Sequence, residues 1–257
     1  MSILDSIEVP KDGAFVMTLT GDAGVGKTSL AATFPKPLFI RAEDGLQAIP
    51  VEARPKALPK IGTPNDLWSQ LEACVEAAMA GEFDYETVVI DSVSQLETLF
   101  SQYIVESDHR NPKSIAQAGG GYGAGYVQLA DMHRRVRRAA ELLKENGVNV
   151  VFICHSDVIS IELPDKDPYN RYELRLHKKC TPHYVDNVDL VGYLRLETFT
   201  TGDGDRKKAK STGKRELICH TDAAQVSKNR FGITKPLIVP HGENPLYDII
   251  PALIESN

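Results

Sequence analysis

A glycine-rich run follows an apolar, strand-like stretch near the start of the sequence. The stretch covers residues 15–20, and the run Gly21-Asp22-Ala23-Gly24-Val25-Gly26-Lys27-Thr28 fits the pattern G-x-x-x-x-G-K-[ST]. Glycines there let successive backbone N–H groups curl around a phosphate, and the helix expected next presents its positive end. The run therefore predicts a strand, a phosphate-binding loop and a helix in that order, with a nucleotide at the end of the strand.

The loop also predicts how the ligand is held. The Lys27 ammonium is expected to reach the β- and γ-phosphates, and the Thr28 hydroxyl to take one position on a bridging Mg²⁺. The residues expected to contact the nucleotide are Gly21, Asp22, Ala23, Gly24, Val25, Gly26, Lys27, Thr28 and Ser29.

Composition is that of an ordinary globular protein. With 257 residues, the chain is expected to form a single domain over residues 1–257, with a core at about 13–200 and a C-terminal hairpin segment at about 201–257. We find no targeting segment or membrane span, which predicts a soluble, cytoplasmic protein. The net charge of −6 argues against indiscriminate wrapping of nucleic acid but leaves room for local basic loops.

The four cysteines form no C-x-x-C pair, which indicates free thiols in a reducing compartment. His177, Cys180 and His183 form an H-x-x-C-x-x-H cluster. Such a cluster has suitable zinc ligands, but no second ligand pair stands nearby, so buried or free side chains are the simpler interpretation.

Strand and helix patterns alternate through most of the chain. This alternation, with continuously apolar strands, predicts an α/β fold: a mostly parallel sheet covered by helices on both faces. Later segments are short and alternate in polarity, which is typical of antiparallel hairpins. Expected helices cover residues 27–34, 64–80 and 126–146; expected strands cover 37–41, 87–91, 148–154, 157–163, 171–177 and 189–197, with a turn at 164–170.

Three polar residues follow apolar strands. Asp91 follows residues 87–90 and is expected to hold a carboxylate toward the Mg²⁺ shell, beside Thr28. Glu43 lies just beyond the strand 37–41, where a carboxylate can deprotonate an attacking water, although it is equally a simple polar strand end. His155 follows the strand 148–154, where a side chain can contact the γ-phosphate or serve only a structural purpose.

This order of parts resembles the RecA-like recombination ATPases, specifically the small phage-encoded RecA-core proteins grouped with Sak-type single-strand annealing proteins. The stretches 21–28, 39–43, 89–93 and 152–155 carry the resemblance. It implies a RecA-like P-loop core that hydrolyses ATP with Mg²⁺, with Lys27, Glu43, Asp91 and His155 in catalytic roles. His155 stands where the larger recombinases typically have Gln.

The run Lys228-Asn229-Arg230 is similar to the paired basic residues of that family. There they cross a subunit boundary and contact the neighbour's γ-phosphate as cationic fingers. For this chain, the resemblance implies a homo-oligomer or filament in which Lys228 and Arg230 act in trans. Two basic residues in an ordinary turn are the alternative.

The resemblance also implies that the loops after the Asp91 strand and the His155 strand bind single-stranded DNA. Cations can follow the phosphate backbone while tyrosines stack on bases. It further implies annealing or recombination, in the bacterial host cytoplasm if the chain is phage-encoded, with a single-strand-binding protein as a further partner. The expected contacts are Arg110, Lys113, Tyr122, Lys166, Arg171, Arg175, Lys178 and Lys179.

Two other functions fit the phosphate loop. In the first, the chain is a nucleotide-dependent partner switch, such as a helicase-loader-like module, and DNA is not its ligand. In the second, it is a small-molecule kinase, which a water-activating Glu43 and the lack of a basic lid between Asp91 and His155 disfavour.

Overall fold

The computed structural model describes residues 13–201 and 208–254. Ten strands and six α-helices are assigned there, together with short 3₁₀ turns. The strands are β1 (Val16–Gly21), β2 (Pro37–Arg41), β3 (Lys56–Ala57), β4 (Thr87–Asp91), β5 (Asn149–Leu163), β6 (Lys166–Leu174), β7 (Leu190–Thr201), β8 (Lys208–Ile218), β9 (Lys228–Asn229) and β10 (Leu237–Val239). The helices are α1 (Lys27–Ala31), α2 (Pro64–Ala80), α3 (Val93–Ser107), α4 (Ala124–Glu145), α5 (Pro182–Val185) and α6 (Pro251–Ile254).

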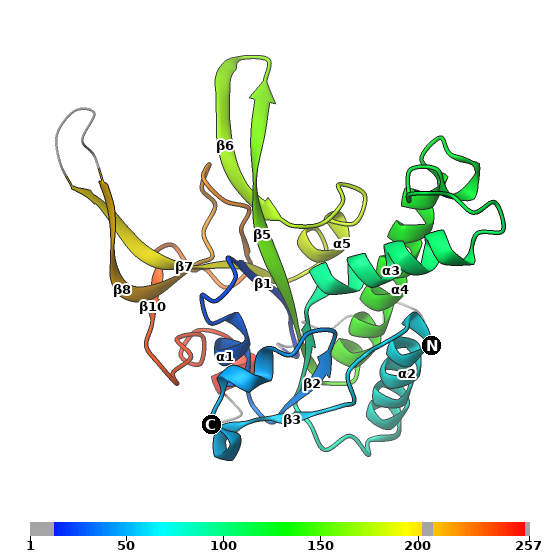
Figure 1. Ribbon diagram of the computed structural model, residues 1–257. Helices are drawn as coiled ribbons and strands as arrows, with labels where there is room; N and C mark the ends of the chain where they lie inside the picture. The colour runs from blue at the N-terminus through cyan, green and yellow to red at the C-terminus, as the bar shows by residue number, and fades with distance from the viewer. Residues whose placement is uncertain (1–12, 202–207, 255–257) are drawn as a thin grey trace, which may run out of the picture.

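The strands form a central sheet in the order β10-β8-β7-β1-β5-β4-β2-β3. The six strands from β7 to β3 are parallel to their neighbours, whereas β8 and β10 continue the sheet antiparallel. β5 runs past the sheet edge and pairs antiparallel with β6, so that a hairpin projects above the core (Figure 1). The expected α/β fold class, a mostly parallel central sheet flanked by helices with antiparallel hairpins toward the C-terminus, is confirmed.

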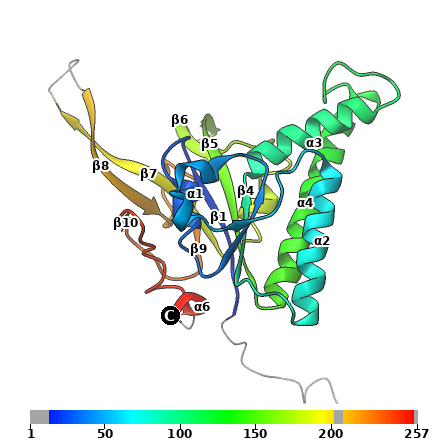
Figure 2. The ribbon, with the colours of Figure 1, turned by 60° about the horizontal axis from the view of Figure 1, so that its bottom comes forward.

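Alternate residues of the central strands serve two separate cores. Val88 and Ile90 of β4 face the layer that contains α2, α3 and α4, whereas Val89 faces the layer that contains α1 and α6. Figures 1 and 2 show the three long helices packed together on one side of the sheet. Because both faces are covered, the central strands are mostly apolar, with Thr18 and Thr20 as buried exceptions in β1, and the charged residues of the motifs lie at the strand ends.

Helix α2 begins and ends where its sequence dictates. Thr63 accepts a hydrogen bond from the N–H of Asp66, whose carboxylate accepts one from the Thr63 N–H, and Pro64 occupies the first turn. Gly81 ends the helix in the left-handed region at φ 70°. The predicted bounds 64–80 are therefore confirmed.

Several expected boundaries were wrong, and one helix was missed. The expected strands 148–154 and 157–163 are one strand, β5, and the expected strand 171–177 ends at Leu174 as part of β6. Residues 93–107 form helix α3, which the sequence analysis left unassigned, with Ser92 capping the Gln95 N–H. The turn after β5 is shorter than the expected 164–170, because β6 begins at Lys166, which pairs with Leu163. Helix α1 ends at Ala31 rather than at residue 34.

Within the described ranges, no helix is both long enough and apolar enough to cross a membrane.

Candidate functional site

Parallel strands bring the polar residues of the sequence motifs to one edge of the sheet. Gly21 of β1 is in register with His155 of β5, and Arg41 of β2 is in register with Asp91 of β4. The N–H groups of Ala42 and Glu43 both donate to the Asp91 carbonyl, at 2.7 and 3.1 Å. Lys27, Glu43, Asp91 and His155 thus surround the phosphate loop, as the sequence predicted.

The loop has the backbone conformation that its glycines permit. Gly24 and Gly26 adopt positive φ angles of 76° and 97°, which residues with a Cβ rarely take. The Lys27 ammonium is buried and donates to the carbonyls of Gly21 and Asp22, at 2.8 Å each. Burial lowers the pKa of Lys27, while the nearby carboxylates of Asp91, Glu43 and Asp22 oppose that shift. A phosphate bound in the loop would present oxygens to the same ammonium.

The Thr28 hydroxyl and the Asp91 carboxylate form an oxygen pair suited to Mg²⁺. The Thr28 Oγ1 donates to Asp91 Oδ2 at 2.9 Å. The absence of a side chain at Gly45 leaves space beside these two oxygens. A Cβ on residue 45 would lie 2.7 Å from Thr28 Oγ1 and 2.9 Å from Asp91 Oδ2, which is too close. Hydroxyl and carboxylate oxygens are the hard ligands that Mg²⁺ prefers. The residues present therefore fit the expected metal.

Burial raises the pKa of Asp91 to about 6. The Thr28 hydrogen bond and the Lys27 charge lower it, but they do not outweigh desolvation. A divalent cation at this position would favour the ionised carboxylate, because opposite charges stabilise one another in a site of low dielectric constant.

Glu43 and His155 form a directly bonded pair. His155 Nε2 lies 3.0 Å from Glu43 Oε1, and the Ser92 hydroxyl donates to the same oxygen. The His155 bond, aided by Ser92, holds the pKa of Glu43 below its ordinary value although burial opposes this. A carboxylate that stays ionised, is partly exposed and lies beside a phosphate loop can act as a general base for water.

Lys228 and Arg230 lie at the other end of the sheet. Arg230 pairs with Asp189 at 2.8 Å, and the Asp189 N–H donates to the Val16 carbonyl at the start of β1. Lys228 donates to the Asp186 carbonyl. The six residues of β1 separate this end from the phosphate loop by about 16 Å. These cations therefore cannot contact a phosphate bound in the loop of the same chain.

The residues expected to contact DNA occupy two segments beyond the carboxyl ends of the strands. Arg110, Lys113 and Tyr122 lie between α3 and α4, where Arg110 pairs with Asp108 and the Tyr122 ring is fully exposed. The β6 hairpin and the segment after it carry the others, whose outer members Arg175, Lys178 and Lys179 are exposed. Lys166 begins β6, and its side chain lies outside the described part of the structure.

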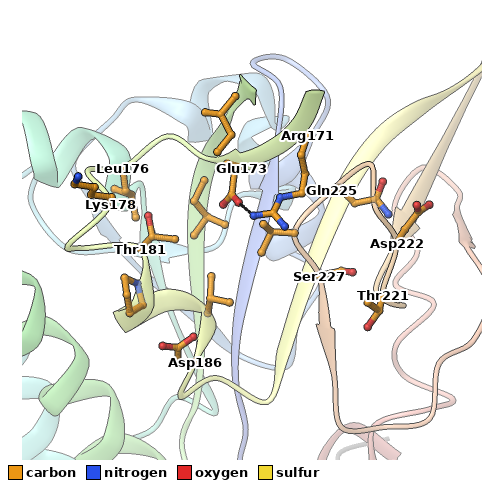
Figure 3. A pocket seen from close by; sticks show the side chains of 15 residues that line it. Arg171, Glu173, Leu176, Lys178, Thr181, Asp186, Thr221, Asp222, Gln225 and Ser227 are labelled. Carbon is orange, nitrogen blue, oxygen red and sulfur yellow. Dashed lines mark hydrogen bonds and ion pairs between the residues drawn. The ribbon is translucent and has the colours of Figure 1, made fainter. Parts of the chain in front are cut away.

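The two segments meet. The Tyr126 and His177 rings stack, with centroids 4.1 Å apart and planes 8° apart. The Lys179 Nζ lies 4.0 Å from the position that a Cβ on Gly123 would take. Below the hairpin, Arg171, Glu173, Lys178 and Gln225 line a cavity of about 540 Å³, with Arg171 bonded to Glu173 (Figure 3).

Two other sequence features have structural explanations. The exposed arginines of α4 pair with acidic neighbours: Arg134 with Asp131 and Arg138 with Glu141. They form a solvated helix face. The H-x-x-C-x-x-H cluster does not assemble, because Cys180 faces Glu97 and His133 instead of His177 and His183.

Sequence reasoning missed three residues of the site. Ser92, which bonds Glu43, directly follows Asp91, so its position was a usable signal. Gly45 gave no signal, because its importance lies in the side chain it lacks. Arg215 of β8 reaches the phosphate loop from across the sheet. Its Nη1 lies so close to Gly26 that a Cβ at that position would collide with it, and its Nη2 donates to the Pro240 carbonyl. No local motif predicts that approach.

The family match agrees with the phosphate-loop motif. Residues 14–231 match the family described as an AAA domain. A curated relative, the SPbeta prophage-derived uncharacterized protein YorG of Bacillus subtilis (strain 168), is 24% identical over 197 residues, or 77% of this chain, and this chain spans about half (54%) of its length. The solved structure of the KaiC-like protein PH0186 from Pyrococcus horikoshii OT3 has a TM-score of 0.45 and 13% identity, over 89% of this chain and 90% of its own.

Proposed function

This chain belongs to the AAA domain family, and from that premise we propose that it is a Mg²⁺-dependent ATPase that binds single-stranded DNA and promotes annealing or recombination. The observation that carries the proposal is the joint position of the ATPase residues and the two basic loops at one end of the sheet. The prophage-derived relative supports a phage origin. Action in the bacterial cytoplasm and membership among the Sak-type annealing proteins are part of the same proposal.

Hydrolysis is assigned to the chain's own residues as follows. The loop N–H groups and Lys27 would hold the β- and γ-phosphates of ATP. Thr28 and Asp91 would hold Mg²⁺, whose charge would offset that of the phosphates. Glu43 accepts a proton from the water that attacks the γ-phosphorus, as the bond from that phosphorus to the bridging oxygen breaks and ADP leaves. His155 keeps the Glu43 carboxylate oriented and ionised through the 3.0 Å bond.

One hydrogen bond and the continuous chain of β5 join this site to the basic hairpin. The Arg175 N–H, just after β6, donates to the His155 carbonyl at 2.8 Å. His155 also begins the part of β5 that leaves the central sheet for the hairpin. A change at the γ-phosphate that moves His155 would therefore move the hairpin, which is a means for ATP to alter DNA affinity.

The position of Lys228 and Arg230 supports head-to-tail assembly. They lie at the opposite end of the sheet from the phosphate loop, so a copy stacked end to end would present them to its neighbour's phosphates. The Arg230 side chain is 56% exposed despite its bond to Asp189, which leaves part of the guanidinium accessible. Such stacking is heterologous and generates rings or filaments.

Nucleotide-dependent DNA binding tests the proposal. Fluorescence anisotropy of a labelled oligothymidylate should show tighter binding with a slowly hydrolysed ATP analogue than with ADP, and the difference should vanish in Lys27→Ala. Equal affinity for DNA in every nucleotide state would contradict the proposed coupling. Nucleotide binding without any DNA binding would favour the partner switch.

A further inference from the structure

Three side chains with metal-binding atoms meet on the helical side of the sheet, away from the phosphate loop. Glu97 comes from α3, His133 from α4 and Cys180 from the segment just before α5. Their ligand atoms all lie within 4.8 Å of one another, and His133 Nε2 is 3.5 Å from Glu97 Oε2. Tertiary folding alone brings them together, since they come from three separate elements.

One polar atom of this cluster is unpaired. His133 is fully buried, and its Nε2 has no hydrogen-bond partner among the described residues. Its Nδ1 lies 2.7 Å from the Tyr184 hydroxyl, so a proton on Nδ1 leaves the Nε2 lone pair directed at the cluster. A buried acceptor without a partner destabilises the folded state, and a bound cation would offset that cost.

The remaining groups orient the other two ligands. The His177 N–H donates to both Glu97 carboxylate oxygens, at 2.8 and 3.0 Å. Cys180 is fully buried and shares a hydrogen bond with Glu97. Burial raises the pKa of Glu97 and of Cys180 and lowers that of His133 to about 3.

We propose that Glu97, His133 and Cys180 bind a zinc ion. Nitrogen, sulfur and carboxylate oxygen are the donors zinc takes, with bond lengths of about 2.0–2.3 Å. A tetrahedron of that size separates its ligands by about 3.3–3.8 Å, so the cluster needs only a small contraction. The Tyr184 and His177 bonds are the outer contacts that hold zinc ligands in place. Binding displaces the Cys180 proton.

The ion would link the basic segment before α5 to two long helices. Cys180 directly follows Lys178 and Lys179, whereas Glu97 and His133 belong to long packed helices. Bound zinc therefore fixes the basic segment against α3 and α4. This site does not depend on the proposed ATPase or DNA-binding activity.

Metal content and cobalt substitution test the site. The full chain, purified without chelator, should contain about one zinc per molecule by mass spectrometry. Replacement by Co²⁺ should produce a thiolate-to-cobalt charge-transfer band. Cys180→Ser should abolish that band, and His133→Gln should weaken metal affinity about tenfold or more.

Two variants serve as matched controls. Cys74→Ser removes another buried thiol, and His183→Ala removes a histidine of the H-x-x-C-x-x-H pattern that does not face the cluster. Both should retain the metal and the band. A wild-type chain that holds no zinc and gives no cobalt band would overturn the proposal, whatever the stability of the variants. So would a band that survives Cys180→Ser.

Discussion

Glu43 has one oxygen bonded to both His155 and Ser92, and this pair of bonds keeps it ionised. Glu43→Gln removes the proton acceptor but keeps the size and most of the hydrogen bonding. We expect hydrolysis to fall about 10²–10⁴-fold while ATP affinity stays within a few fold. Phosphate release and binding of a fluorescent ATP analogue measure the two effects.

The neighbouring Asp44 supplies the control for this variant. It is also a strand-end carboxylate, but it pairs with Lys60 at 2.5 Å on the surface. Asp44→Asn should leave hydrolysis unchanged. If Glu43→Gln hydrolysed ATP at the wild-type rate, Glu43 would be only a polar strand end.

Asp91 is held in a site that disfavours its charge. Its pKa rises from 3.8 to about 6, so the folded state binds a proton more tightly than the unfolded state. Stability therefore falls as pH rises from about 4 to about 6 and stays lower above that, by about 3 kcal/mol. Asp91→Asn removes the charge and should stabilise the nucleotide-free protein at pH 8, with no gain at pH 4.

Urea unfolding of wild type and Asp91→Asn at both pH values measures this prediction. The same variant should lose Mg²⁺-dependent hydrolysis. A variant that is less stable than wild type at pH 8 would show that Asp91 is stabilised by its Thr28 and Lys27 contacts rather than destabilised by burial.

Among the elements, the β5–β6 hairpin and the segment after it connect the ATP site to the basic loops. Lys178→Ala combined with Lys179→Ala should weaken single-stranded DNA binding about tenfold or more. The salt dependence should become shallower, because each lost phosphate contact lowers the logarithmic slope by about 0.7. Anisotropy titrations across a salt series measure both changes.

The solvated face of α4 provides a control variant that removes the same number of positive charges. Arg134→Ala combined with Arg138→Ala also removes two cations, but these pair with acidic neighbours on the helix. DNA affinity should change little. Equal losses for both double variants would indicate a general charge effect, with no role for the segment that carries Lys178.

The sequence predicted the elements whose signals are local. The strands 37–41 and 87–91 and the helix 64–80 have their expected bounds, because apolar runs and caps mark them. Helix α3 was missed although Val93, Leu96, Phe100 and Ile104 form a buried stripe at helical spacing. The polar residues after Cys154 indicated that a strand ends there and a new one begins. In the structure β5 is continuous, because its second half pairs with β6.

The same distinction applies to the site. Lys27, Thr28, Glu43, Asp91 and His155 could be predicted as neighbours because each lies at or just beyond the end of a recognisable strand or belongs to the loop motif. The approach of Arg215 to Gly26 and the Glu97, His133 and Cys180 cluster depend on tertiary packing. No local pattern in one sequence predicts which distant side chains will meet.

For the whole molecule, the distance between the phosphate loop and Arg230 requires a second copy if Arg230 acts in hydrolysis. Arg230→Ala should abolish hydrolysis with ATP binding intact. Lys27→Ala should also abolish hydrolysis, because it loses the phosphate contact. A mixture of the two inactive variants should regain part of the activity, because mixed interfaces contain one intact Lys27 and one intact Arg230.

Lys235→Ala, an exposed cation on the same segment, is the control and should hydrolyse ATP normally. A mixture that stays inactive while the variants still assemble would limit Arg230 to its structural bond with Asp189.

Phosphate release from ATP, measured with and without single-stranded DNA, tests the recombination ATPase most directly. Lys27→Ala controls for contaminating activity. We predict Mg²⁺-dependent release that single-stranded DNA stimulates and that Lys27→Ala abolishes. Release that DNA leaves unchanged, in a protein that does not bind DNA, would contradict this function.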